Sequence, residues 1–266
     1  MSNNRPIGIF DSGVGGITVF KEIRKYLPNE NIIYFGDTKH NPYGAKSKET
    51  VTRLSTGNVQ FLLGKNVKYV VVACNTASAL SLPLLKKFYS VPMIGVVDTG
   101  AKAALETTKN GKIGVIGTRA TVESGAYLRA LLKLGPKLKI KSLACPLFVP
   151  LVEEGWSGSK VAELTAFEYL KEFKKLNIDT LVLGCTHYPF LKPVIGKILK
   201  NTKLIDSATE TAKAVRKALE QTSMLRRNKT KPAYTFYVTD APERFKKIGS
   251  SFLGYGLGKV NLVELE

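Results

Sequence analysis

Two cysteines stand at equivalent points of two similar segments. In residues 69–79, a run of β-branched apolar residues reaches Cys74 and continues into small polar residues and helix formers. Residues 181–189 repeat this plan around Cys185. An apolar run followed by a helix start is typical of a buried parallel strand with the cysteine at its carboxyl end. The repetition predicts two thiols, one from each half of the chain, that face each other across a cleft.

Paired thiols of this kind are compatible with three chemistries. A redox pair is one, although the Cys-x-x-Cys spacing is absent. A metal site is another, although the chain has only two histidines and Cys-Thr-His matches no zinc spacing. The third is proton transfer, in which one thiol removes a proton from a carbon and the other protonates the opposite face. A helix start beside each sulfur favours the thiolate, so we expect a pKa below the ~8.5 of free cysteine.

Polar side chains accompany both thiols. Asp11 follows a short apolar run and opens a glycine-rich turn, 11–16, that lacks the spacing of nucleotide-binding loops. We expect this carboxylate to act where the strand ends converge. His187, two residues past Cys185, can donate to a carboxylate or tune the thiol. Four more residues can both cap a helix and bind a carboxylate: Ser12, Asn75, Thr76 and Thr186.

Simple packing is the competing interpretation of every cysteine, because free cysteine is among the most buried residue types. We assign it to Cys145, which no helix-capping residue follows. If it also held for the other two cysteines, the chain would be a basic binding protein without catalytic thiols. His40 lies in the loop before the expected helix 47–65 and receives no role.

Strands alternate with helices along the chain, which predicts an α/β fold of mostly parallel sheets flanked by helices. Ligands then bind beyond the carboxyl ends of the strands. The expected strands are 7–10, 31–35, 69–73, 92–97, 112–116, 139–144, 181–184, 203–205, 234–239 and 259–263. The expected helices are 18–26, 47–65, one ending at 88, 101–108, 121–134, 160–176, 189–200, and two starting at 207 and 242. A polar, basic segment spans about 226–231.

A crossing at Asp98-Thr99-Gly100 is expected to lead into a second domain, where the alternation of strands and helices starts afresh. A chain of 266 residues is long enough for two such cores.

Composition limits the setting. The chain is 44% hydrophobic, has no apolar run long enough to cross a bilayer, and begins without a signal-peptide pattern. Three cysteines build no disulfide framework, so we expect a cytoplasmic protein. The net charge of +19 raises the possibility of nucleic-acid binding. Because the lysines are scattered and no nucleic-acid motif accompanies them, we favour solvated helix faces that also attract an acidic small substrate.

Four segments together resemble the cofactor-independent aspartate/glutamate racemase family, and glutamate racemases in particular. They are Phe10-Asp11-Ser12-Gly13-Val14-Gly15-Gly16, Asp37-Thr38 with Pro42-Tyr43-Gly44, Ala73-Cys74-Asn75-Thr76-Ala77, and Gly184-Cys185-Thr186-His187-Tyr188-Pro189. The resemblance runs from about residue 7 to residue 205. Residues 146–153 also look like the family's segment that ends in a helper glutamate, here Glu153.

The resemblance implies interconversion of L- and D-glutamate without cofactor or metal, supplying D-glutamate for peptidoglycan. By similarity, Cys74 deprotonates D-glutamate and Cys185 deprotonates L-glutamate. Asp11, His187 and Glu153 are the implied helpers of the thiols. The implied substrate-binding residues are Asp11, Ser12, Tyr43, Gly44, Asn75, Thr76, Thr118, Thr121, Thr186 and His187.

The resemblance also implies two similar α/β domains with the active site in the cleft between them. The first comprises residues 1–97 plus 207–266, so that the last segment of the chain completes it, and the second comprises residues 98–206. The protein is further expected to be a homodimer. An alternative substrate on the same fold is aspartate or another acidic or cyclic compound. The depth of the pocket decides between glutamate and these substrates, and the spacing of the motifs does not report that depth. A pyridoxal enzyme would need a Schiff-base lysine, and no local signature proposes one.

Overall fold

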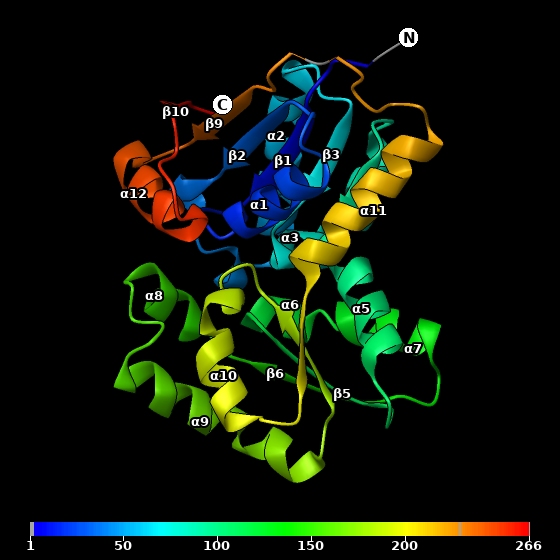
Figure 1. The fold of residues 1–266 in the computed structure, drawn as a ribbon, viewed down its shortest axis with the longest axis vertical. Helices are drawn as coiled ribbons and strands as arrows, with labels where there is room; N and C mark the ends of the chain where they lie inside the picture. The colour runs from blue at the N-terminus through cyan, green and yellow to red at the C-terminus, as the bar shows by residue number, and fades with distance from the viewer. Residues whose placement is uncertain (1–2, 229, 266) are drawn as a thin grey trace.

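The computed structural model describes residues 3–228 and 230–265 and places their strands in two parallel sheets, one above the other in Figure 1. The expected α/β class is confirmed. Met1, Ser2, Glu266 and Lys229, the last within the basic segment expected at 226–231, lie outside the described residues. In the described part of the chain, no helix combines the length and apolar character needed to span a membrane.

The first sheet has six strands in the order β10-β9-β2-β1-β3-β4. Their bounds are β1 (Ile7–Asp11), β2 (Ile32–Gly36), β3 (Tyr69–Val72), β4 (Met93–Gly95), β9 (Tyr234–Val238) and β10 (Val260–Leu262). Every neighbouring pair is parallel, and β9 pairs with β2. Strands from both ends of the chain therefore share one sheet, which we call the first lobe together with its covering helices.

Helices cover both faces of this sheet because side chains of β1 alternate between two apolar clusters. Ile7 and Ile9 pack in one cluster and Phe10 packs in the other. The covering helices are α1 (Ile17–Tyr26), α2 (Lys48–Gly64), α3 (Asn75–Leu80), α4 (Leu82–Phe88), α11 (Ser207–Gln221) and α12 (Pro242–Leu253). A strand buried on both faces reads as an uninterrupted apolar run, which is why β1 and β3 were recognisable in the sequence.

The second sheet has four strands in the order β6-β5-β7-β8 and forms the second lobe. Their bounds are β5 (Lys112–Gly117), β6 (Lys139–Ala144), β7 (Thr180–Gly184) and β8 (Lys203–Asp206). The helices around this sheet are α5 (Val96–Thr107), α6 (Arg119–Glu123), α7 (Ala126–Leu134), α8 (Phe148–Glu153), α9 (Lys160–Leu176) and α10 (Lys192–Ile198). Short 3-10 turns are η1 (Thr38–His40), η2 (Tyr43–Ala45) and η3 (Tyr188–Leu191).

The two crossings between the lobes run through α5 and α11, which pack against each other. The residues expected to form the crossing, Asp98-Thr99-Gly100, lie inside α5. Domain boundaries at 97/98 and 206/207 stay a prediction.

Several expected elements differ from the observed ones. The strand expected at 92–97 ends at Gly95, and the helix expected at 101–108 starts at Val96. Two β-branched residues, Val96 and Val97, read as strand, yet both are buried by the helix. The helix expected at 121–134 is split at Gly125, whose φ of 64° is left-handed. The helix ending at 88 is split at Ser81, and the one at 189–200 is η3 followed by α10.

The carboxyl ends of both sheets point to the junction between the lobes. β1 ends at Asp11, β3 ends two residues before Cys74, and β7 ends immediately before Cys185. Helices α3 and α6 contact each other at this junction (Figure 1). The fold therefore brings the strand ends that carry the candidate chemistry to one place.

Candidate active site

Cys74 caps the amino end of α3. Its sulfur accepts the Ala77 N–H at 3.5 Å and lies 3.7 Å from the Ser12 hydroxyl oxygen. The residue is only 6% exposed. The strand-to-helix turn thus places the thiol inside the junction, held between a backbone donor and a hydroxyl.

The expectation that the helix start lowers the pKa of this thiol is wrong for Cys74. Burial, and after it a negative charge on Asp11, raise the pKa of Cys74 to about 12. The Ala77 N–H and the Ser12 hydroxyl lower the pKa by less. A charge on Cys185 also raises the pKa of Cys74. The two sulfurs, one from each lobe, therefore share one electrostatic environment.

Cys185 contacts His187, which in turn contacts Glu153. Its sulfur is 3.7 Å from His187 Nδ1, and His187 Nε2 is 3.0 Å from Glu153 Oε1. Burial alone would lower the pKa of His187, but hydrogen bonds to Cys185 and Glu153 raise it to about 10. Burial alone would raise the pKa of Glu153, but His187 holds it below its usual range. An imidazolium paired with a carboxylate therefore stands beside Cys185.

Asp11 is fully buried at the end of β1. Its Oδ2 accepts the Gly13 N–H at 3.1 Å, whereas its Oδ1 has no hydrogen-bond partner among the described residues. Burial raises the pKa of Asp11 to about 6, although the His187 charge and backbone N–H groups lower it. A buried carboxylate oxygen without a donor is costly, which marks Oδ1 as a place for a ligand donor.

Three threonines join the lobes. Thr76 Oγ1 lies 2.9 Å from Thr118 Oγ1 and 3.1 Å from Thr121 Oγ1, and the latter two are 2.9 Å apart. Thr76 lies in the first turn of α3 in the first lobe, whereas the other two belong to the cap and first turn of α6. The three hydroxyls predicted as substrate-binding groups thus lie together.

Asn75 is oriented from the opposite lobe. The Tyr127 hydroxyl of α7 donates to Asn75 Oδ1 at 2.7 Å. Asn75 Nδ2 is buried and has no hydrogen-bond partner in the described part of the chain. Because its oxygen is held by Tyr127, the amide group presents an unused donor to the junction.

Two glycines allow the lobes to approach closely. A Cβ at Gly15 would lie 2.3 Å from Thr186 Oγ1 and 2.5 Å from His187 Cε1. A Cβ at Gly44 would lie 2.5 Å from Thr118 Cβ. Any larger residue at either position forces the lobes apart. The structure therefore brings Ser12, Gly44 and Thr186 to the junction with the groups above.

Tyr43 differs from the other predicted substrate-binding residues. Its side chain is 1% exposed and packs in the same apolar cluster as Cys74. Its hydroxyl donates to Asp37, at 2.5 Å. The buried side chain anchors the Tyr43–Gly44 backbone, and the hydroxyl is used within the protein.

Sequence reasoning missed three residues at this site. Asp37 follows the carboxyl end of β2, so the rule that selected Asp11 also applies to it. Asn41 donates to Glu153 Oε1 at 3.2 Å across the lobes. Neither Asn41 nor Tyr127 carries a local signal, because both contacts depend on how the lobes meet. Cys145 is buried in the apolar core, in keeping with its predicted packing role.

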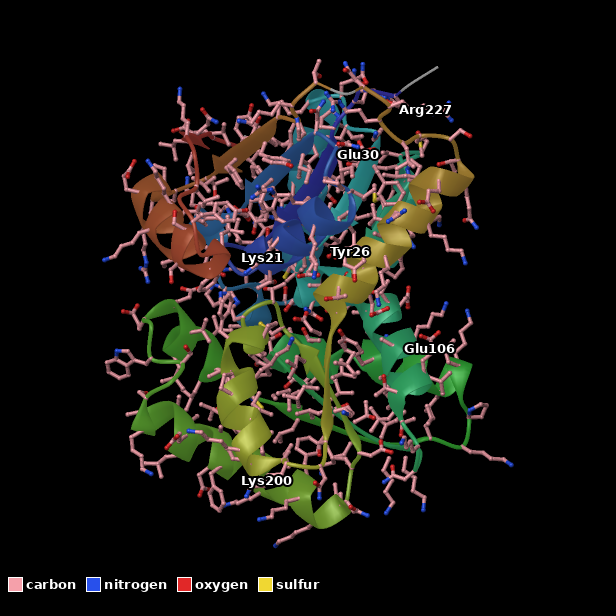
Figure 2. The ribbon with its side chains drawn as sticks, in the orientation of Figure 1. Lys21, Tyr26, Glu30, Glu106, Lys200 and Arg227 are labelled. Carbon is pink, nitrogen blue, oxygen red and sulfur yellow. The ribbon has the colours of Figure 1, made fainter. Side chains whose placement is uncertain are left out.

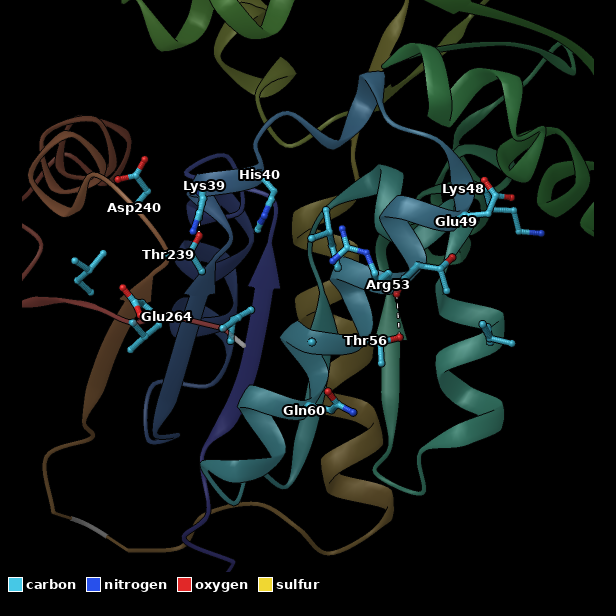
Figure 3. Close-up of a pocket in the computed structure, with 17 residues that line it drawn as sticks. Lys39, His40, Lys48, Glu49, Arg53, Thr56, Gln60, Thr239, Asp240 and Glu264 are labelled. Atoms are coloured by element: carbon cyan, nitrogen blue, oxygen red, sulfur yellow. Dashed lines mark hydrogen bonds between the residues drawn. The ribbon is translucent and has the colours of Figure 1, made fainter.

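A cavity of about 330 Å³ opens beside the junction. Its lining includes Gly13 and Asn41 of the first lobe and Glu153 of the second. A larger groove of about 1050 Å³ lies elsewhere, between α2, η1 and the carboxyl-terminal segment (Figure 3). That groove contains none of the predicted site residues, whereas the smaller cavity contains one of them, Glu153.

The described residues contain no group of three or more histidine, cysteine, aspartate or glutamate side chains able to hold a metal ion. The positive charge is spread over both lobes rather than concentrated at the junction. Figure 2 places exposed Lys21 on α1 and exposed Lys200 just beyond α10, at distant points of the molecule.

Residues 12–215 match the model of the Asp/Glu/hydantoin racemase family. The chain belongs to this family. The match covers most of the chain, including both thiols. Every site residue expected from the resemblance except Asp11 also falls within it.

Relatives in this family are similar over their whole length. A glutamate racemase of Geobacter metallireducens is 50% identical over 98% of this chain and 97% of its own. A glutamate racemase of Neisseria gonorrhoeae is 48% identical, covering 100% and 98%. The crystal structure of a glutamate racemase from Francisella tularensis in complex with D-glutamate has a TM-score of 0.94 at 40% identity, covering 99% and 98%.

Aspartate racemases share the fold alone. The aspartate racemase of Picrophilus torridus is 20% identical and has a TM-score of 0.57, covering 81% of this chain and 94% of its own. This likeness is much weaker than that to the glutamate racemases, and it carries no information on substrate.

Proposed function

We propose that this racemase interconverts L- and D-glutamate by a two-base mechanism without a cofactor. The observation that carries the proposal is the placement of Cys74 and Cys185. Each thiol follows a strand of a different sheet, both are buried at one junction, and a charge on Cys185 raises the pKa of Cys74. Two acid/base groups on opposite sides of one carbon are what inversion requires.

In the D-to-L direction, the Cys74 thiolate takes the α-proton of D-glutamate, so an S–H bond forms as the C–H bond breaks. Cys185 then gives its S–H proton to the opposite face of the carbon and is left as a thiolate. The L-to-D direction exchanges these roles. Because burial raises the pKa of Cys74, its proton must first leave, and in this proposal the Asp11 carboxylate, whose charge acts on the thiol, accepts it.

His187 serves the other thiol in this proposal. Its imidazolium, kept charged by Glu153, lies 3.7 Å from the Cys185 sulfur and stabilises negative charge there. Cys185 therefore reaches the thiolate beside a fixed positive charge, whereas Cys74 reaches it beside a carboxylate. Cys185 thus has a positively charged helper, His187, and Cys74 has a carboxylate helper, Asp11.

In this proposal, the substrate is bound by buried polar atoms that have no hydrogen-bond partner among the described residues. Asn75 Nδ2 has a free donor for a substrate carboxylate, and Asp11 Oδ1 has free acceptor capacity for the α-ammonium. Hydroxyl and backbone groups of Ser12, Thr76, Thr118, Thr121 and Thr186, with the Tyr43–Gly44 backbone, complete the proposed pocket. Glutamate is favoured over aspartate because the full-length relatives at 45–50% identity are glutamate racemases.

The test is racemisation of purified protein on D-glutamate and D-aspartate, side by side and without added cofactor. We expect the optical signal of glutamate to decay to zero, with little change for aspartate. Cys74→Ser and Cys185→Ser should each abolish the decay. Near-normal turnover in either variant contradicts the two-base proposal, and faster decay with aspartate contradicts the substrate assignment. No turnover with either amino acid favours the basic binding protein.

We further propose that the D-glutamate formed supplies peptidoglycan, and that the enzyme acts in the cytoplasm as a homodimer. These proposals rest on the family resemblance. Depletion in cells should be rescued by external D-glutamate, and light scattering on the purified protein should give twice the chain mass. Failure of rescue or a monomer mass would contradict the respective proposal.

A further inference from the structure

Asp37 is a buried carboxylate with an unusual number of side-chain donors. It is 0% exposed and lies just beyond β2. It accepts hydrogen bonds from the Tyr43 hydroxyl at 2.5 Å, the Thr239 hydroxyl at 2.9 Å and His40 Nδ1 at 2.9 Å. A buried carboxylate is costly unless donors satisfy it, so this arrangement fixes the positions of all three donors.

Tyr43 donates the shortest of these hydrogen bonds. Burial raises the pKa of Tyr43, and the Asp37 charge raises it further, so the phenol keeps its proton and donates it. Asn58 Nδ2 donates to the same phenol oxygen at 3.0 Å. The Tyr43 ring is therefore held at its polar end by two groups and elsewhere by the apolar cluster that contains Cys74. Such a side chain has no freedom to change rotamer.

The residue after Tyr43 touches the other lobe. Gly44 lies so close to Thr118 that a Cβ would be 2.5 Å from the threonine Cβ. The position of the Tyr43–Gly44 backbone relative to Thr118 thus depends on the Tyr43 ring, and the ring depends on Asp37. Thr118 in turn contacts Thr76, which follows the cap residue Cys74 by two positions.

We propose that Asp37 is a positioning residue for substrate binding. It holds the Tyr43 ring, and through the ring it sets the Tyr43–Gly44 backbone against Thr118. The inference rests on the proposed function, because it takes the Tyr43–Gly44 backbone to be part of the glutamate pocket. Asp37 itself need not touch the substrate: all three of its described donors are side chains of the first lobe.

The outer side of Asp37 faces a different surface. His40 and Thr239 both line the groove of Figure 3, and the His40 side chain is 36% exposed there. Asp37 therefore links two residues of the groove, His40 and Thr239, to Tyr43, which packs in the cluster that contains Cys74. His40, which received no role from the sequence, shields the carboxylate from solvent.

The experiment compares Asp37→Asn with the parent in steady-state kinetics on glutamate. An amide keeps the shape but weakens the charge-assisted bond, so KM should rise about tenfold, with a smaller change in kcat. A role confined to stability would lower the unfolding temperature and the active fraction while leaving KM unchanged, and that result would overturn the inference. Thr239→Val is the control, because it removes a different donor of Asp37 and should raise KM much less. An equal rise in both variants would also overturn the assignment.

A double-mutant cycle with Tyr43→Phe tests the route of the effect. If Asp37 acts through Tyr43, the double variant should have nearly the KM of the worse single variant. If the KM of the double variant rises by the product of the two single-variant factors, Asp37 acts independently of Tyr43, which contradicts the inference. A parent protein that fails to racemise glutamate would defeat the proposed function itself. A parent that racemises while Asp37→Asn keeps its KM would defeat this inference alone.

Discussion

The Glu153 carboxylate lies 3.0 Å from His187 Nε2, on the side of the ring opposite Cys185. Hydrogen bonds to Cys185 and to Glu153 together raise the pKa of His187 to about 10, although the ring is only 3% exposed. A buried histidine without a carboxylate would be neutral at pH 7. The charge at the Cys185 half of the site therefore depends in part on Glu153, which lies on the far side of the ring from the sulfur.

Glu153→Gln should weaken this pairing and change the pH dependence of stability. The pKa of His187 is raised from 6.5 to about 10, so the folded protein binds more protons than the unfolded chain between these values. Its stabilising contribution is complete below pH 6.5 and is lost as the pH rises towards 10. In urea titrations from pH 6 to 10, we expect the parent to lose more stability than the variant. Parallel profiles would show that Glu153 does not hold the charge.

Asp11→Asn should slow racemisation about 100-fold, the scale of one acid/base group, without unfolding the protein. The pKa of Asp11 is raised from 3.8 to about 6, so its contribution to stability is present below pH 3.8 and lost as the pH rises through 6. The variant should therefore be at least as stable as the parent at pH 7. A large drop in unfolding temperature at that pH would instead assign Asp11 a structural role.

Gly15→Ala should force the lobes apart, because the new methyl group would overlap Thr186 and His187. We expect a loss of about 1–3 kcal/mol of unfolding free energy and most of the activity. Gly196→Ala is the matched control, since nothing lies within 4 Å of the added carbon and alanine favours the helix by about 0.5–1 kcal/mol. Full activity in Gly15→Ala would contradict the closed junction.

Tyr127→Phe should release the Asn75 amide without creating a cavity. Asn75 Oδ1 loses its donor, so the amide can rotate and Nδ2 is no longer presented in one direction. Loss of one neutral hydrogen bond corresponds to an increase in KM of about fivefold, with kcat affected less. The check is steady-state kinetics in both directions. An unchanged KM would mean that Asn75 is oriented by its backbone alone.

The part of the site built from strand ends could be predicted from the sequence. Cys74, Cys185 and Asp11 each follow an apolar run, and parallel strands carry such residues to one edge. The roles of Thr118 and Thr121 came only from the family resemblance. Asp37 also follows a strand end, but it was not selected as a site residue. Tyr127 lies in a helix, and its hydrogen-bond partner, Asn75, belongs to the other lobe.

The expectations from the sequence that proved wrong concern buried residues. The helix-start N–H groups beside Cys74 predicted a lowered pKa, but the closed junction removes water and adds Asp11, and both effects raise it. In the same way, Val96 and Val97 have the pattern of a strand, yet α5 buries them against the rest of the protein. Helix α8, which ends at Glu153, carried no clear periodic pattern and was not expected.

The fate of the α-hydrogen tests the two-thiol account most directly. D-glutamate is incubated with the enzyme in heavy water, and deuterium at the α-carbon is measured in both enantiomers at early times. The account predicts deuterium in the newly formed L-glutamate and almost none in the remaining D-glutamate, because each thiol serves one face. The mirror experiment from L-glutamate should give the mirror result. L-glutamate that retains the original hydrogen, or equal labelling of both enantiomers at early times, would contradict the account.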